Sequence, residues 1–164
     1  MTNRLPQDYP RRVLLAVTGL SPQVVTETVY ALTQHTAPPW IPTEIRLVTT
    51  SEGAERAHLS LLSDDPGWFH ALRRDYALPD IRFDKDCIEV VRDDQGSALE
   101  DIRSVTDNER TADCISEHVR ALSADEDCSL HVSIAGGRKT MGFYAGYALS
   151  LFGRAQDRLS HVLV

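Results

Sequence analysis

Short apolar runs alternate along the chain with segments in which apolar residues recur every three or four positions. Arg12–Val17 (RVLLAV) is a continuous apolar run, typical of a strand that is covered on both faces. Similar runs predict further strands at Glu44–Thr50, Cys87–Val91, Ser129–Ile134 and Leu159–Val164. Strands that alternate with helices favour right-handed crossovers, so the pattern predicts an α/β fold with a doubly wound, mostly parallel, Rossmann-like sheet.

The predicted helices begin at local signals. Ser21 followed by Pro22 predicts an N-cap and a first helical position, and Asp107 predicts the cap of a later helix. Helical spacing covers the segment after Pro22 and residues 51–62, 68–76, 108–122 and 141–152. Between two of these helices, residues 92–107 form a polar, acidic stretch with two interpretations, a lid over a site or a disordered solvated loop.

Two loops after strands carry the candidate chemistry, Thr18–Gln23 (TGLSPQ) and Ala135–Thr140 (AGGRKT). In an open parallel sheet, ligands bind outside the carboxyl ends of the strands, where such loops lie. Gly136 and Gly137 leave backbone N–H groups open to a phosphate, Arg138 can donate two parallel hydrogen bonds to it, and Lys139 adds a point charge. The alternative is a tight turn followed by a solvated helix start. Neither loop has a Walker or GxGxxG pattern.

The helix predicted at 141–152 is apolar on nearly all sides. Gly142, Gly146 and Ser150 recur every fourth residue and form a flat groove, while Phe143 and Tyr147 make other faces apolar too. The groove can pack on the protein's own sheet or on a second subunit. We expect a homodimer contact here.

Composition narrows the classes of function. The 164 residues suit one domain, 1–164, and the net charge of -7 argues against a surface that grips long nucleic acid by its phosphates. Three widely spaced cysteines and six scattered histidines predict reduced thiols and no metal site. No signal peptide or membrane span is recognisable, so we expect a cytoplasmic protein. The chain ends inside the last predicted strand, so either this strand is terminal or the chain is a truncated part of a longer protein.

The blocks VLLAVTGLSPQVVTETVYAL and SIAGGRKTMGFYAGYALSLFGR, followed by DRLSHVLV, resemble the CRISPR-associated Rossmann fold (CARF) family. The branch they resemble comprises ring nucleases and the sensor domains of type III CRISPR ribonucleases. The resemblance implies a homodimer that binds cyclic oligoadenylate, an antiviral second messenger, across its two-fold axis. In the family the ring lies over the loops that follow the first and fourth strands.

Carried over to this chain, the resemblance implies a site without metal or cofactor. Its implied catalytic residues are Lys139 and Arg138 for charge stabilisation and Ser21 or Thr18 for orienting the attacking 2′-hydroxyl. The implied ligand-binding residues are Thr18, Gly19, Ser21, Gln23, Ala135, Gly136, Gly137, Arg138, Lys139 and Thr140.

Three functions remain open at this point. The first is a metal-independent ring nuclease, and the second is a non-catalytic sensor that activates a fused or partner effector. The third is an unrelated small-nucleotide or phosphosugar protein on the same fold. An arginine-then-histidine ribonuclease spacing, Arg154 to His161, is disfavoured because His161 falls in a predicted strand. The sequence does not indicate whether the ring has four or six adenylates.

Overall fold

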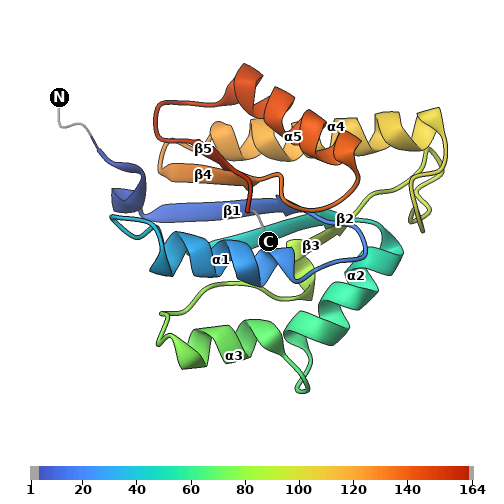
Figure 1. Cartoon of the computed structure of the whole chain (residues 1–164). Helices are drawn as coiled ribbons and strands as arrows, with labels where there is room; N and C mark the ends of the chain where they lie inside the picture. Colours follow the sequence, from blue (N-terminus) through green and yellow to red (C-terminus); the bar gives the residue numbers. More distant parts are fainter. Residues whose placement is uncertain (1–3, 163–164) are drawn as a thin grey trace.

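A five-stranded parallel sheet forms the centre of the molecule (Figure 1), in a computed structural model that describes residues 4–162. The strands are β1 (Arg11–Val17), β2 (Glu44–Thr49), β3 (Ile88–Val90), β4 (Cys128–Ser133) and β5 (Arg158–Ser160). They lie in the order β3-β2-β1-β4-β5, and each neighbouring pair is parallel. The predicted doubly wound, Rossmann-like α/β fold is therefore confirmed.

Helices cover both faces of the sheet. In Figure 1, α4 (Val105–Ser123) and α5 (Lys139–Phe152) lie above it, and α1 (Val24–Gln34), α2 (Ser51–Ala57) and α3 (Trp68–Asp75) lie below. Short helical turns complete the chain at η1 (Pro6–Asp8), η2 (His58–Leu62) and η3 (Lys85–Cys87). No helix among residues 4–162 has the length and hydropathy needed to cross a membrane.

The central strand β1 is buried on both faces, which explains its continuous apolar sequence. Val13, Leu15 and Val17 belong to the core beneath α4 and α5, whereas Leu14 and Ala16 belong to the core on the other face. All five side chains are at most 1% exposed. A strand with both faces buried needs no polar alternation, so it reads as a continuous apolar run.

Two predicted helix caps were wrong. Asp107 is the third residue of α4, whose N-cap is Ser104: the Ser104 hydroxyl accepts the Asp107 N–H, and the Asp107 carboxylate accepts the Ser104 N–H, both at 3.0 Å. This reciprocal pair is a capping box. Ser21 does not cap α1, because a turn intervenes and the helix begins at Val24 with Gln23 as its N-cap.

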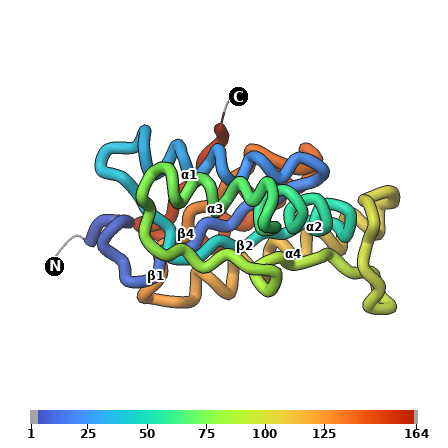
Figure 2. Tube along the Cα trace, turned by 90° about the horizontal axis from the view of Figure 1, so that it is seen from below, coloured from blue at the N-terminus to red at the C-terminus, as the bar shows by residue number. Residues whose placement is uncertain are grey.

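The acidic segment 92–104 follows a defined path between β3 and α4, so the interpretation of 92–107 as a disordered loop was wrong. Leu99 and Ile102 are buried in the core beneath α4 and α5, and the backbone of Asp93 and Ser97 is joined by a hydrogen bond of 2.9 Å. This segment, yellow and yellow-green in Figure 2, projects at one end of the molecule. Its two buried side chains fix its base to the rest of the protein.

The last strand is shorter than predicted. β5 ends at Ser160, and Leu163 and Val164, which the prediction included, lie outside the described residues. Arg154 precedes this strand and has a structural role: its guanidinium contacts the buried Asp157 and donates hydrogen bonds to the carbonyl oxygens of Asp125 and Cys128. The three cysteines are free, as predicted.

Candidate functional site at the switch point of the sheet

The loops that follow β1 and β4 lie side by side. β1 and β4 are direct neighbours in register, with Ala16 opposite Ser133, and their crossover helices α1 and α5 leave toward opposite faces of the sheet. A side-chain carbon at Gly19 would lie 3.7 Å from the Cα of Gly137. This is the topological switch point, where open α/β sheets bind their ligands.

Two glycines allow the second loop its close approach to the first. A Cβ at Gly136 would lie 2.8 Å from the carbonyl oxygen of Val17 and equally close to a methyl group of Val24. Gly137 has a φ of +77°, in the left-handed region, and a Cβ there would lie 2.9 Å from the sulfur of Met141. Both positions therefore require glycine, one because of space and the other because of backbone conformation as well.

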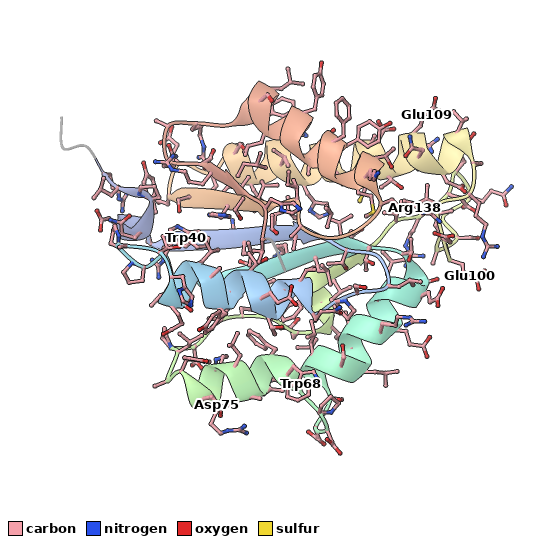
Figure 3. All side chains as sticks on the ribbon, in the orientation of Figure 1. Trp40, Trp68, Asp75, Glu100, Glu109 and Arg138 are labelled. Atoms are coloured by element: carbon pink, nitrogen blue, oxygen red, sulfur yellow. The ribbon has the colours of Figure 1, made fainter. Side chains whose placement is uncertain are left out.

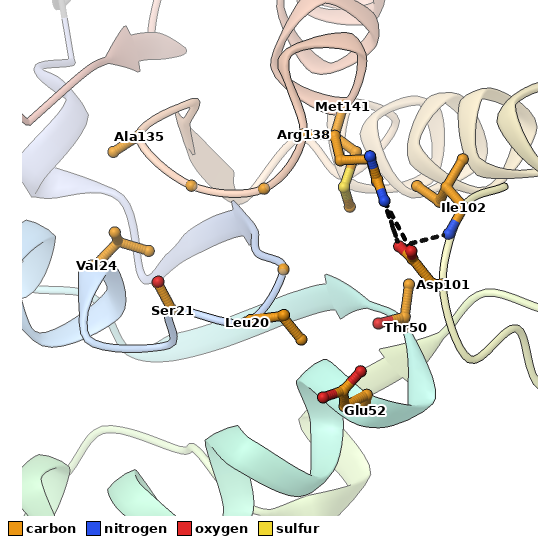
Figure 4. Close-up of a pocket in the computed structure, with 13 residues that line it drawn as sticks. Leu20, Ser21, Val24, Thr50, Glu52, Asp101, Ile102, Ala135, Arg138 and Met141 are labelled. Atoms are coloured by element: carbon orange, nitrogen blue, oxygen red, sulfur yellow. Dashed lines mark hydrogen bonds and ion pairs between the residues drawn. The ribbon is translucent and has the colours of Figure 1, made fainter.

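A cavity of about 420 Å³ opens between the two loops (Figure 4). Six of the sequence-predicted site residues line it: Gly19, Ser21, Ala135, Gly136, Gly137 and Arg138. The remaining lining residues, which were not predicted, are Leu20, Val24, Thr50, Glu52, Asp101, Ile102 and Met141. The loops that follow β2 and β3 thus complete the site that the loops after β1 and β4 begin.

Arg138 is held by a carboxylate from the acidic segment. Its guanidinium donates to both carboxylate oxygens of Asp101, at 2.7 and 2.9 Å from Nη2 and 3.2 Å from Nε. The Ile102 N–H also donates to the Asp101 carboxylate, at 2.8 Å. The hydrogen bonds from Arg138, the largest cause, hold the pKa of Asp101 below its ordinary value. In Figure 4 this pair closes the side of the cavity opposite Ser21 and Val24.

Comparison of the sequence with models of known protein families identifies the family of this chain. Residues 21–164 match the family model described as CRISPR-associated protein NE0113. The chain belongs to this CRISPR-associated family. A search of curated proteins found no match. The matched range includes Ser21 and the whole Ala135–Thr140 loop, so all residues that line the cavity except Gly19 and Leu20 lie within it.

Four predicted site residues of this NE0113-family chain do not line the cavity. Lys139 and Thr140 are exposed in the first turn of α5, and Gln23 is exposed before α1. Among the described residues, Lys139 has no ion-pair partner within 4.0 Å. Thr18 is fully buried, and its hydroxyl has no hydrogen-bond partner among residues 4–162. Lys139 thus stays available to a ligand that extends beyond the cavity, whereas the Thr18 hydroxyl does not face solvent.

The cavity of the NE0113-family chain is not purely basic. Glu52, in the first turn of α2, lines it together with Asp101, and it pairs with Arg56 at 3.2 Å. Glu100 and Glu109 lie at the same end of the molecule as Arg138 (Figure 3). An anionic ligand in the cavity must therefore compete with the Asp101 carboxylate for the Arg138 guanidinium.

The sequence held a partial signal for the missed residues. Glu52 follows β2 within the stretch TTSEG, and the carboxyl end of every strand in a parallel sheet meets the same edge. Glu52 could therefore have been predicted in the same way as the residues of the loops that follow β1 and β4. Asp101 is different, since its contact with Arg138 spans 37 positions and follows no local pattern.

Proposed function

We propose that this chain binds cyclic oligoadenylate at the switch-point cavity, as a homodimer, and cleaves the ring without a metal ion. The observation that carries the proposal is the convergence of the loops after β1 and β4 on one cavity, with bare backbone at Gly136 and Gly137 beside Arg138. These loops carry the residues by which the sequence resembles the CARF family. Membership of a CRISPR-associated family supports the same interpretation.

The size of the cavity favours a ligand shared between two subunits. Cavities that enclose a drug-sized molecule measure about 300–1,000 Å³, so the roughly 420 Å³ found here suits a nucleotide-sized part of a ring. Arg138 and Lys139 provide two cations per chain, fewer than the phosphates of a tetra- or hexa-adenylate ring. A two-fold axis beside the cavity doubles both the space and the cations.

The outer face of α5 supplies a surface suited to that axis. Phe143, Tyr147 and Leu151 are 66, 56 and 60% exposed, and the rings of Phe143 and Tyr147 stack with centroids 6.0 Å apart. Large exposed apolar side chains gathered on one helix are typical of a protein contact. Because α5 begins at Lys139, a two-fold axis near the N-terminal end of this helix would bring two copies of the cavity rim together.

The proposed chemistry is an internal transfer at phosphorus. The 2′-oxygen of one adenosine attacks the adjacent phosphorus and loses its proton, the bond to the 5′-oxygen breaks, and that oxygen takes up a proton. The products are a linear oligoadenylate with a 2′,3′-cyclic phosphate and a 5′-hydroxyl. In this scheme Arg138 and Lys139 stabilise the negative charge on the phosphorane oxygens, and Ser21 orients the 2′-hydroxyl. No histidine among residues 4–162 lines the cavity, so we expect slow turnover.

The deciding experiment incubates the protein with cyclic tetra-adenylate and cyclic hexa-adenylate in chelator and separates the products by chromatography. We expect linear products that end in a 2′,3′-cyclic phosphate. Lys139→Ala should abolish them and weaken binding, whereas Ser21→Ala should leave binding intact and slow cleavage. Lys85→Ala is the matched control, because Lys85 is an exposed lysine in η3 and does not line the cavity. Unchanged turnover in both Lys139→Ala and Ser21→Ala would remove the loops from the mechanism.

A second candidate is a sensor that binds the ring without cutting it. The pairing of Arg138 with Asp101 favours this candidate, because a ligand that takes Arg138 releases a carboxylate on the segment that leads into α4. Such a sensor works by binding its two states with different affinities. Tight binding with the ring intact after long incubation would select it over the nuclease.

A further inference from the structure

Three side chains of metal-binding type converge on the face of the sheet beneath α4. Glu89 comes from β3, and Cys114 and His118 come from α4. One ligand atom from each, a carboxylate oxygen, the thiol sulfur and a ring nitrogen, all lie within 4.8 Å of one another. None of the three residues lines the switch-point cavity.

The fold itself brings these residues together. Cys114 and His118 are four positions apart, so they project from the same side of α4 on successive turns. Glu89 pairs in register with Val48 of β2, and Val48 belongs to the core beneath α4 and α5. Residues adjacent across parallel strands point to the same face, which directs Glu89 toward α4.

The three side chains form no side-chain hydrogen bonds within the described part of the chain, although Cys114 packs against the core. Within residues 4–162 neither the Cys114 thiol, the His118 ring nor the Glu89 carboxylate makes a hydrogen bond at standard distances. Burial, and to a lesser degree the Glu89 charge, raises the pKa of Cys114 to about 11, and burial lowers the pKa of His118. The imidazole is therefore neutral at neutral pH, and metal binding would release the proton of the thiol to solvent.

We propose that Glu89, Cys114 and His118 bind one Zn²⁺ ion, which clips the edge strand β3 to α4. Sulfur, imidazole nitrogen and carboxylate oxygen are the ligands that Zn²⁺ takes. Ligand atoms around a tetrahedral Zn²⁺ lie roughly 3.3–3.7 Å apart, by geometry from its usual bond lengths. Binding needs a contraction of about 1 Å from the observed limit of 4.8 Å.

The charges around the cluster suit a divalent ion. A thiolate and the Glu89 carboxylate together carry the charge that Zn²⁺ neutralises. The cation facing the cluster is Arg46 of β2, whose positive charge contributes to the lowered pKa of His118. Arg46 is itself paired with Glu44, which reduces its repulsion of a metal ion. Glu89 is exposed, so water can reach a fourth coordination position.

The ion would have a structural effect at a weak point of the sheet. β3 has only three residues and is hydrogen-bonded to β2 as an edge strand. The chain between Glu89 and Cys114 includes the acidic segment that carries Asp101. Closing this loop at both ends with a metal would reduce the freedom of the segment that holds Arg138. The site is separate from the proposed ring chemistry, which uses no metal.

The test is a Co²⁺ titration of the reduced, chelator-treated full chain, followed by displacement with Zn²⁺. We expect one Co²⁺ per chain, with a thiolate-to-cobalt charge-transfer band and the visible absorption of a tetrahedral ion. Cys114→Ser should remove the charge-transfer band, and His118→Gln and Glu89→Gln should each weaken binding at least about 10-fold. The matched controls are Glu117→Gln and His58→Gln, which remove the same residue types outside the cluster and should bind as the unchanged protein does.

A second measurement separates binding from misfolding. Saturating Zn²⁺ should raise the thermal midpoint of the unchanged protein and of both controls, but not that of His118→Gln, whose folded state is verified by circular dichroism. A Co²⁺ spectrum without a thiolate band, or equal affinity in the cluster variants and the controls, would overturn the proposal. Ring binding is assayed separately in chelator, so failure of the metal site leaves the proposed function untouched.

Discussion

Replacing Asp101 with asparagine should make ring binding tighter. The Asp101 carboxylate occupies the hydrogen-bonding edge of Arg138 that a phosphate would use, with its shortest contact at 2.7 Å. Asparagine keeps the oxygen that accepts the Ile102 N–H but loses the charge that holds the guanidinium. The ligand then no longer has to displace a carboxylate.

The magnitude follows from the exposure of the pair. The Asp101 and Arg138 side chains are 35 and 55% exposed, so solvent screens their attraction. Pairs of this kind contribute about 0.2–1 kcal/mol, which corresponds to an affinity gain of up to about fivefold. Loss of the pair should cost the fold less than about 1 kcal/mol and lower the thermal midpoint by no more than about 4 °C.

The pH dependence has a defined sign. The folded-state pKa of Asp101 lies below the unfolded value of about 3.9, so its ion pair stabilises the protein above that pH and is lost as the pH falls through the folded-state pKa. Assays above about pH 5 therefore compare the intact pair with the variant.

Titration calorimetry with an uncleaved ring analogue measures the effect. Glu100→Gln is the matched control, because it removes the same charge from the adjacent position, where Glu100 pairs with Arg103 at 3.6 Å. Weaker binding by Asp101→Asn would refute the competition argument and make Asp101 a residue that positions Arg138. Equal gains in both variants would show a general charge effect instead.

Three further outcomes test other parts of the structure. Burial, and secondarily Arg158, lowers the pKa of His131 to about 4, so the folded protein should lose about 3 kcal/mol of stability as the pH falls from 6.5 to 4, and His131→Gln should flatten the urea-unfolding free energy over that range. Asp157→Asn should cost about 3–5 kcal/mol in the same assay, because it leaves the partly buried Arg154 unpaired; a loss below about 1 kcal/mol would contradict this. Tyr147→Glu should give a monomer by light scattering where Leu59→Glu, an exposed change on η2, leaves a dimer; equal masses would count against the α5 contact.

The alternation of strands with helices and the parallel direction of the strands could be predicted, because both depend on patterns along the chain. The order of the strands across the sheet was not predicted. β1 and β4 are buried on both faces, so each is a continuous apolar run that can be recognised in the sequence. The positions of the two candidate loops follow directly, since each comes after such a run. The helix caps were less predictable. Ser104 and Asp107 are both good cap residues, and the structure uses them together, one as cap and one as its reciprocal partner.

What escaped prediction depends on contacts across the fold. Asp101 reaches Arg138 because Leu99 and Ile102 bury the base of the acidic segment and fix its path, and neither side chain has a periodic signal in so short a stretch. The Cys114 and His118 spacing is visible in the sequence, but it gains chemical meaning only when the register of β3 places Glu89 opposite. Both cases share a cause: local patterns place residues at the ends and faces of elements, whereas a site needs the pairing of elements that lie far apart in sequence.

The segment between β3 and α4 links the two cases, because it carries Asp101 to the cavity and is bounded by Glu89 and Cys114. A metal held by Glu89 and Cys114 would therefore fix both ends of this segment, whereas a ligand at Arg138 would act on its middle, at Asp101.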